Sequence, residues 1–189
     1  SAGLYGAEMV LLALAEAQQQ MGWHPVIASI GEPGIPTKAV EIEGRRRQIP
    51  VVPFRMRPGP NPAGVRDILR YARRHAVDLL HLHGYKGDIL FGFIPRRRLR
   101  MPKVATLHGW THTGRINRLW AYEMLDTLSL RCMDAVVLVT DRMRRHPRLR
   151  GLRPSRVHVV PNGVADHLPF PAGSAEDGGR SDSNPEDTR

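Results

Sequence analysis

Apolar residues recur at two spacings along the chain, and their alternation predicts the order of its helices and strands. Between 7 and 21, Val10, Leu11 and Leu14 fall on one helical face, and Gly22 follows where a helix would end. After residue 76, short apolar runs alternate with longer segments of helical spacing. We expect strands at 77–83, 103–109, 134–140 and 156–161, and helices at 86–98, 115–132 and 141–149. This order predicts a parallel sheet with helices on both faces.

The first part of the chain is less regular. We expect a strand at 24–30, extended segments at 39–44 and 49–54, a loop at 57–64 and a helix at 65–75. Residues 1–8, SAGLYGAE, are typical of the glycine loop after the first strand of a Rossmann-like, doubly wound sheet, but no apolar run precedes them. That first strand would be central. We therefore expect a gap between 24–30 and 77–83.

Composition indicates one domain and an ordinary cellular setting. Residues 1–168 are predicted to form a single α/β domain, whereas 169–189 are polar, acidic and rich in Gly, Pro and Ser, which predicts a disordered tail. The single Cys132 can form no internal disulfide, which fits a reducing compartment. No run approaches the ~20 apolar residues that span a bilayer, and no signal peptide is present. We expect a cytoplasmic protein.

The formal net charge of +10 calls for an anionic partner or for well-solvated helix faces. Most basic residues are arginines, in clusters at 45–47, 73–74, 96–100 and 142–150. One hypothesis is a nucleic-acid-binding α/β module. It rests on charge alone, since no helix-turn-helix or RRM pattern and no interleaving of basic and aromatic residues supports it. We expect no specific nucleic acid partner.

Two predicted strands end in the same way. HLHGYKG at 81–87 and LHGWTHT at 107–113 each place a histidine, a glycine and an aromatic residue after an apolar run. Because the carboxyl ends of parallel strands meet at one edge of the sheet, these residues should share a site. His108 is predicted to be functional and His81 to be a buried, hydrogen-bonded histidine, while for His83 both interpretations stay open. Tyr85 and Trp110 could stack on a sugar ring or on an apolar chain.

A metal site is an alternative for the same residues. His81 and His83, with His108 and His112, are spaced like the ligands of metal-dependent hydrolases. Such enzymes need further ligands at later strand ends, where the sequence offers few. A metal hydrolase is therefore the weakest of the hypotheses.

Five segments together resemble a known family. GAEMVLLALAEAQQQMGWHPVIAS, HLHGYKGDILFG, VATLHGWT, DAVVLVTDRM and RVHVVPNGV are similar, in order and spacing, to the N-terminal domain of family 4 glycosyltransferases. These are retaining enzymes of the GT-B fold that use nucleotide sugars. The resemblance covers about residues 3–164.

The resemblance implies roles for particular residues. His108 would be the active-site histidine that contacts the transferred sugar, and Gly6 and Ala7 would belong to the loop that faces the donor phosphates. The acceptor-side loops would contain Gly84, Tyr85, Lys86, Gly109 and Trp110. The family pattern implies no metal and no cofactor, with a nucleotide sugar as co-substrate.

The resemblance also implies a function for the chain. It would be the acceptor-side domain of a glycosyltransferase of polysaccharide, glycolipid or cell-envelope glycan synthesis. The segment that supplies the donor-binding domain in the family is not recognisable after 164, so we expect this chain alone to be inactive. The acceptor would be a glycan or a lipid-linked glycan, and the arginines near 96–100 and 142–150 favour peripheral contact with an anionic membrane.

Overall fold

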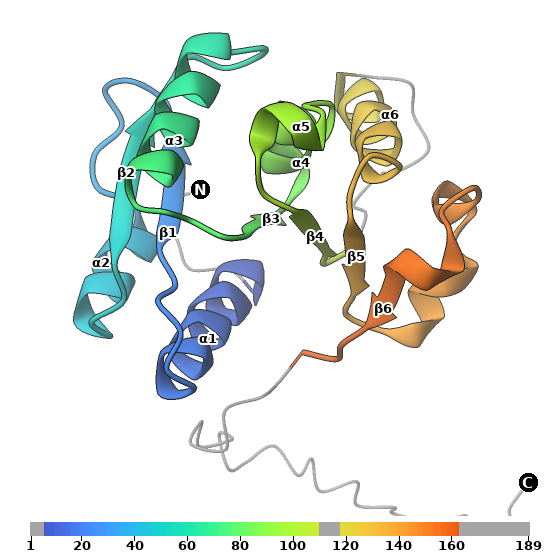
Figure 1. Cartoon of the computed structure of the whole chain (residues 1–189), viewed down its shortest axis with the longest axis horizontal. Coiled ribbons are helices and arrows are strands. Elements are labelled where there is room, and N and C mark those ends of the chain that lie inside the picture. The colour runs from blue at the N-terminus through green and yellow to red at the C-terminus, as the bar shows by residue number, and fades with distance from the viewer. Residues whose placement is uncertain (1–5, 110–117, 163–189) are drawn as a thin grey trace, which may run out of the picture.

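The computed structural model describes residues 6–109 and 118–162, and in them parallel strands form two sheets (Figure 1). The first sheet pairs β1 (Ile27–Gly31) with β2 (Val51–Arg55). The second has the order β3-β4-β5-β6, with bounds Leu80–His83, Lys103–Leu107, Ala135–Leu138 and Val157–Val159. The predicted α/β class with parallel strands is confirmed.

Helices connect successive strands, as parallel pairing requires. They are α1 (Gly6–Gln20), α2 (Ala39–Arg46), α3 (Pro62–Arg74), α4 (Tyr85–Gly92), α5 (Arg96–Leu99) and α6 (Arg118–Leu130). Asn61 caps α3, because its side-chain oxygen accepts a hydrogen bond of 2.8 Å from the backbone nitrogen of Gly64. None of the described helices is both long and apolar enough to cross a membrane.

The two sheets are not hydrogen-bonded to each other, yet they share one hydrophobic core. β1 pairs with β2 and β3 with β4, so the break falls between β1 and β3, where the sequence predicted a gap. Ile68 and Leu69 of α3 belong to the same buried cluster as Leu82 of β3, and Ile30 of β1 and Phe54 of β2 pack against that cluster. Helix α3 therefore joins the halves into one domain.

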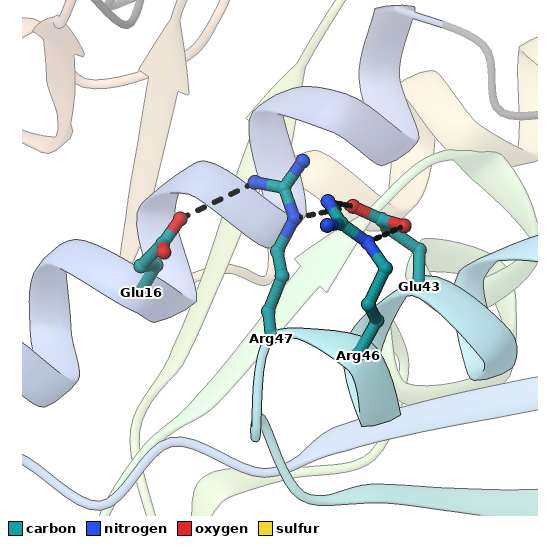
Figure 2. A network of polar contacts seen from close by, with 4 residues as sticks. All are labelled: Glu16, Glu43, Arg46 and Arg47. Carbon is teal, nitrogen blue, oxygen red and sulfur yellow. Dashed lines mark hydrogen bonds and ion pairs between the residues drawn. The ribbon is translucent and has the colours of Figure 1, made fainter. Parts of the chain in front are cut away.

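Helices α1 and α2 are tied together by a charged network at the edge of the molecule. Figure 2 shows Arg47, which follows α2, between Glu16 of α1 and Glu43 of α2. Its Nη1 atom lies 3.2 Å from Glu16, and its Nε atom lies 2.7 Å from Glu43. Hydrogen bonds from Arg46 and Arg47 lower the pKa of Glu43 to about 2. The carboxylate therefore stays ionised in all but strong acid.

The prediction of an extended segment at 39–44 is wrong, because this segment lies in α2. The alternation of acidic and apolar residues suggested a strand, but Val40, Glu41 and Gly44 are the buried residues, which is a helical spacing. Glu41 can be buried because it accepts hydrogen bonds from Ser29 (2.7 Å) and Arg55 (2.9 Å). Glu41 is thus a core position despite its charge, because Arg55 pairs with it inside the domain.

Two predicted helices are shorter or broken in the structure. The segment 86–98 divides into α4 and α5 because Pro95, at the N-cap of α5, interrupts it. The segment 141–149 forms two 3-10 turns, Asp141–Arg145 and Pro147–Leu149, rather than a helix, and Pro147 separates them. The start of the predicted helix 115–132 and the predicted tail 169–189 lie outside the described residues.

Helices α4 and α6 approach each other closely at Gly92. A β-carbon placed on Gly92 would lie 2.5 Å from Cβ of Ser129 and 3.1 Å from Cε of Met133. The missing side chain is therefore what lets the two helices touch.

We expect Gly92→Ala to destabilise the domain by about 1–3 kcal/mol, because the added methyl group would push α4 and α6 apart. Gly87→Ala is the matched control in the same helix, where a β-carbon meets its nearest neighbour at an ordinary 3.5 Å. Urea unfolding of the two variants measures the difference. Equal stability of the two would contradict the close contact.

Candidate functional site

The site lies at the carboxyl ends of β3 and β4, which run in parallel and in register. His83 pairs with Thr106, and His81 pairs with Val104. The Nε2 atom of His81 lies 2.7 Å from the hydroxyl of Thr106, so His81 is hydrogen-bonded within the sheet. The predicted hydrogen bond of His81 is confirmed, but the residue is half-buried rather than buried.

A glycine follows the last histidine of each strand, and both glycines adopt backbone angles that other residues rarely take. Gly84 has φ of 92° and Gly109 has φ of 131°. After Gly84 the chain enters helix α4 at Tyr85, whereas the residues that follow Gly109 lie outside the described part of the chain.

His83 and His108 contact each other across the two strand ends. The Nδ1 atom of His83 lies 3.2 Å from the Nε2 atom of His108. Burial lowers the pKa of His83 to about 3, with contributions from His81 and His108, and burial also lowers the pKa of His108. Both imidazoles are therefore neutral near pH 7, and one nitrogen of the contact donates its hydrogen to the other. A neutral His108 can hydrogen-bond a hydroxyl, but it brings no positive charge to a phosphate.

A pair of buried carboxyl groups lies beside the histidines. Asp88 of α4 is fully buried, and Asp126 of α6 is 4% exposed. Burial, together with the nearby Asp126, raises the pKa of Asp88 to about 9, and burial also raises the pKa of Asp126. Two carboxylates this close cannot both ionise in a low dielectric, so the pair holds one proton at neutral pH. The pair thus carries one negative charge, and its oxygens can accept hydrogen bonds.

These groups line a pocket of about 150 Å³. Its lining comprises Ala7, His83, Gly84, Tyr85, Asp88, Thr106, Leu107, His108, Gly109, Glu123 and Asp126. Sites for drug-sized ligands begin at roughly 300 Å³, so this pocket has the size of one wall of a site rather than of a whole one.

The pocket contains most of the residues that the sequence singled out, but not all of them. Ala7, Gly84, Tyr85, His108 and Gly109 come together there. Gly6 opens α1 and Lys86 lies in the first turn of α4, and the structure places neither in the pocket lining. Trp110 lies outside the described residues.

The carboxyl groups of the pocket were missed by the sequence analysis. Asp88, Glu123 and Asp126 come from two helices, and no short motif connects them. One signal was available for Asp88, which stands within the apolar run GDILFG, where a solvated acid is unexpected. Glu123 is held in place by an ion pair of 2.7 Å with Arg148.

In the part of the chain that the structure describes, no three side chains are grouped as metal ligands. Among residues 6–109 and 118–162, no group of His, Cys, Asp and Glu side chains is arranged to hold a metal ion. His81, the first of the four histidines proposed as ligands, is hydrogen-bonded to Thr106. His112, the last of them, lies outside the described residues.

The fold described above is that of a Rossmann-like α/β domain. The chain belongs to glycosyltransferase family 4, which it matches over residues 5–167. No curated protein matches the chain in sequence.

Two solved proteins show the same fold. HepE from Anabaena, in complex with UDP, is similar over 87% of this chain, with a TM-score of 0.67 and 17% sequence identity, and its complex with UDP and glucose is equally similar. The chain spans 42% of the length of HepE. A structure of sucrose-phosphate synthase from Thermosynechococcus elongatus has a TM-score of 0.51 and 16% identity, covering 82% of this chain and 84% of that one. At such identities the likeness establishes the fold.

The shifted pKa values of Asp88 and His83 predict an unusual dependence of stability on pH. On unfolding, the pKa of Asp88 returns from about 9 to its ordinary 3.8. Between these two pH values the folded state binds one more proton than the unfolded state, so the stability falls as the pH rises. On unfolding, the pKa of His83 returns from about 3 to 6.5, so this group makes the stability rise with pH below pH 6.5. Between pH 3.8 and 6.5 the two effects on stability oppose each other, and above 6.5 a fall of up to about 1.4 kcal/mol per pH unit remains.

Asp88→Asn should therefore remove the fall above pH 6.5 and leave the variant more stable than the parent at pH 8.5. Below pH 6.5 its stability should rise with pH, because the His83 effect is no longer offset. Asp67→Asn, which alters an exposed carboxylate on α3, is the control. Urea unfolding across this range tests the prediction, and a parent whose stability is level from pH 6.5 to 8.5 would contradict it.

Proposed function

We propose that the chain is the acceptor-side domain of a retaining, nucleotide-sugar-dependent glycosyltransferase of the hexosyltransferase type. The reaction would break the bond between the sugar and the diphosphate and form a new bond to an acceptor hydroxyl, with retention at the sugar. The leaving phosphate would receive the proton of that hydroxyl. Family membership supports the reaction class.

The contact between His83 and His108 is the observation that carries this proposal. Sugar hydroxyls are neutral and both donate and accept hydrogen bonds, and so does a neutral imidazole. The Asp88–Asp126 pair adds carboxyl oxygens that can accept hydrogen bonds from sugar hydroxyls at the same pocket. A site built to bind a phosphate or a metal would instead need cations or ionised ligands.

Contact with the donor is proposed for the start of α1. Ala7 lies in the pocket lining, and α1 begins beside it at Gly6. The first turn of a helix presents free N–H groups to an anion, which fits the donor phosphates. The titles of the HepE structures name UDP and glucose in that protein, which supports a nucleotide sugar as donor here. The proposal requires no further cofactor and no metal.

The acceptor and the cellular location follow from the same reasoning. We propose a glycan or a lipid-linked glycan as acceptor, bound along Gly84, Tyr85, Lys86, Gly109 and Trp110, in polysaccharide, glycolipid or cell-envelope glycan synthesis. The domain would work in the cytoplasm, in contact with the inner face of the membrane. Because the chain spans 42% of HepE, we infer that it does not complete the transfer by itself.

Binding to this chain alone should be weak. In NMR titrations with UDP- and GDP-sugars, we expect the imidazole signals of His83 and His108 to shift at millimolar ligand while that of His81 does not. The reason is that the chain provides one wall of the site. Submicromolar binding or turnover by the chain alone would contradict the half-site, and a panel of sugars that leaves His108 unmoved would contradict the site itself.

His108→Ala and His81→Ala should have opposite effects. In an enzyme that joins this domain to a donor-binding domain, His108→Ala should lower kcat at least about tenfold, because a hydrogen bond that strengthens in the transition state is lost. It should cost about 1 kcal/mol of stability or less. His81→Ala removes the hydrogen bond to Thr106 and leaves a cavity, so we expect a loss of about 2 kcal/mol with turnover per folded molecule retained. The reverse pattern would make His108 a structural histidine.

A further inference from the structure

Helix α6 buries four of its polar residues and exposes several of its apolar ones, although Leu130 at its end is buried. Glu123, Asp126, Thr127 and Ser129 are buried. Met124, Leu125 and Leu128 are 36%, 42% and 42% exposed. A surface helix of a globular domain ordinarily shows the opposite arrangement.

The inward contacts fix this orientation. Glu123 forms an ion pair with Arg148 of the second 3-10 turn, and Asp126 lines the same pocket as the buried Asp88 of α4. At Ser129 the helix touches Gly92 of α4. A rotation that buried the leucines would expose or break all of these contacts, so the apolar outer face is built into the fold.

Exposed arginines lie around the end of this face. Arg131 comes one turn after Leu128, and the Gly151 loop packs near its guanidinium group. An ion pair of 3.2 Å between Arg96 and Asp134 brings α5 to the end of α6, and the two helices lie beside each other in Figure 1. Arg97 follows Arg96 in α5, and Arg150 and Arg153 lie close to Gly151 in the sequence; all three are exposed, as is Arg131. No described acidic residue forms an ion pair with any of these four exposed arginines.

We propose that this outer face of α6, Met124, Leu125 and Leu128 with the arginines around it, docks on an anionic lipid bilayer. Apolar side chains of an interfacial helix enter the boundary between headgroups and acyl chains, and neighbouring arginines pair with lipid phosphates. Packing of two copies through this face would instead bring the same arginines of both chains together. Charge complementarity therefore favours the bilayer over a second copy.

Docking in this way places the candidate site close to the membrane. Glu123 and Asp126, on the inner side of the same helix, line the pocket. A helix is about 10 Å across, so the pocket lies about one helix diameter from the lipid surface. An acceptor anchored in the bilayer would reach it without leaving the membrane.

Membrane contact was proposed above, and the new inference is the face that makes it. Vesicle binding measures attachment alone, so the experiment can fail while sugar transfer stands, or succeed while sugar transfer fails. Co-sedimentation of the full 189-residue chain with vesicles should show binding to equal parts of phosphatidylglycerol and phosphatidylcholine. Binding to phosphatidylcholine alone should be at least about tenfold weaker.

Variants identify the face. Leu125→Ser with Leu128→Ser should weaken binding at least about tenfold without lowering the thermal midpoint, since both side chains are already exposed. Met21→Ser with Ile42→Ser, which alters residues that are 72% and 59% exposed on α1's end and α2, should bind as the parent does.

Three results would overturn the proposal. One is a parent chain that does not sediment with the anionic vesicles, and another is an α6 double variant that sediments as well as the parent. The third is a dimer in analytical ultracentrifugation that the α6 double variant converts to a monomer, because α6 would then bind a second copy.

Discussion

The buried ammonium group of Lys103 is the interaction on which the second sheet and its site depend. It stands at the start of β4 with 2% of the residue exposed, and donates hydrogen bonds to the carbonyl oxygens of Phe91, Gly92 and Ile94 at the end of α4. Burial lowers the pKa of Lys103, but the negative end of a helix dipole stabilises the charge that remains. The backbone of Lys103 also bonds Asp134 in both directions, at 2.8 and 3.0 Å. One residue thus fixes the end of α4, and the connection between α6 and β5, to the same strand.

This anchoring decides what the pocket contains. Helix α4 begins directly after His83, and its other end is held by Lys103, so the position of Asp88 is set from both sides. Helix α6 is set in the same way by Asp134 and by the close approach of Ser129 to Gly92. The meeting of Asp88 and Asp126 follows from this geometry. A pair of carboxyl groups that must keep a proton stabilises no fold above the ordinary pKa of an aspartate, so its presence beside His83 and His108 is better explained by binding than by folding.

The sequence predicted the parts of this structure that depend on local pattern. Apolar runs located β3 to β6, and the repeated His-Gly pairs predicted that His83 and His108 would meet, because parallel strands bring their ends to one edge. It failed where a long-range contact reverses the local pattern. Glu41 reads as a solvated acid and is buried by Ser29 and Arg55, and the polar residues of α6 face the core. Neither the ion pair of Glu41 nor the proton held by the Asp88–Asp126 pair can be recognised from the sequence before the partner residue is known.

The two faces of helix α6 show most clearly how a site constrains the sequence around it. Its polar residues are needed on the inner side, since Asp126 and Glu123 form the wall of the pocket and Glu123 holds Arg148. The need for polar residues on the inner side does not explain the residues on the outer side. Charged residues there would not have destabilised the fold and would have favoured contact with water. Leucine and methionine there, on a chain with a net charge of +10, are unfavourable for an isolated domain in water. Docking as proposed would give both faces of the helix a physical reason, with one face toward the site and the other toward an apolar, anionic surface.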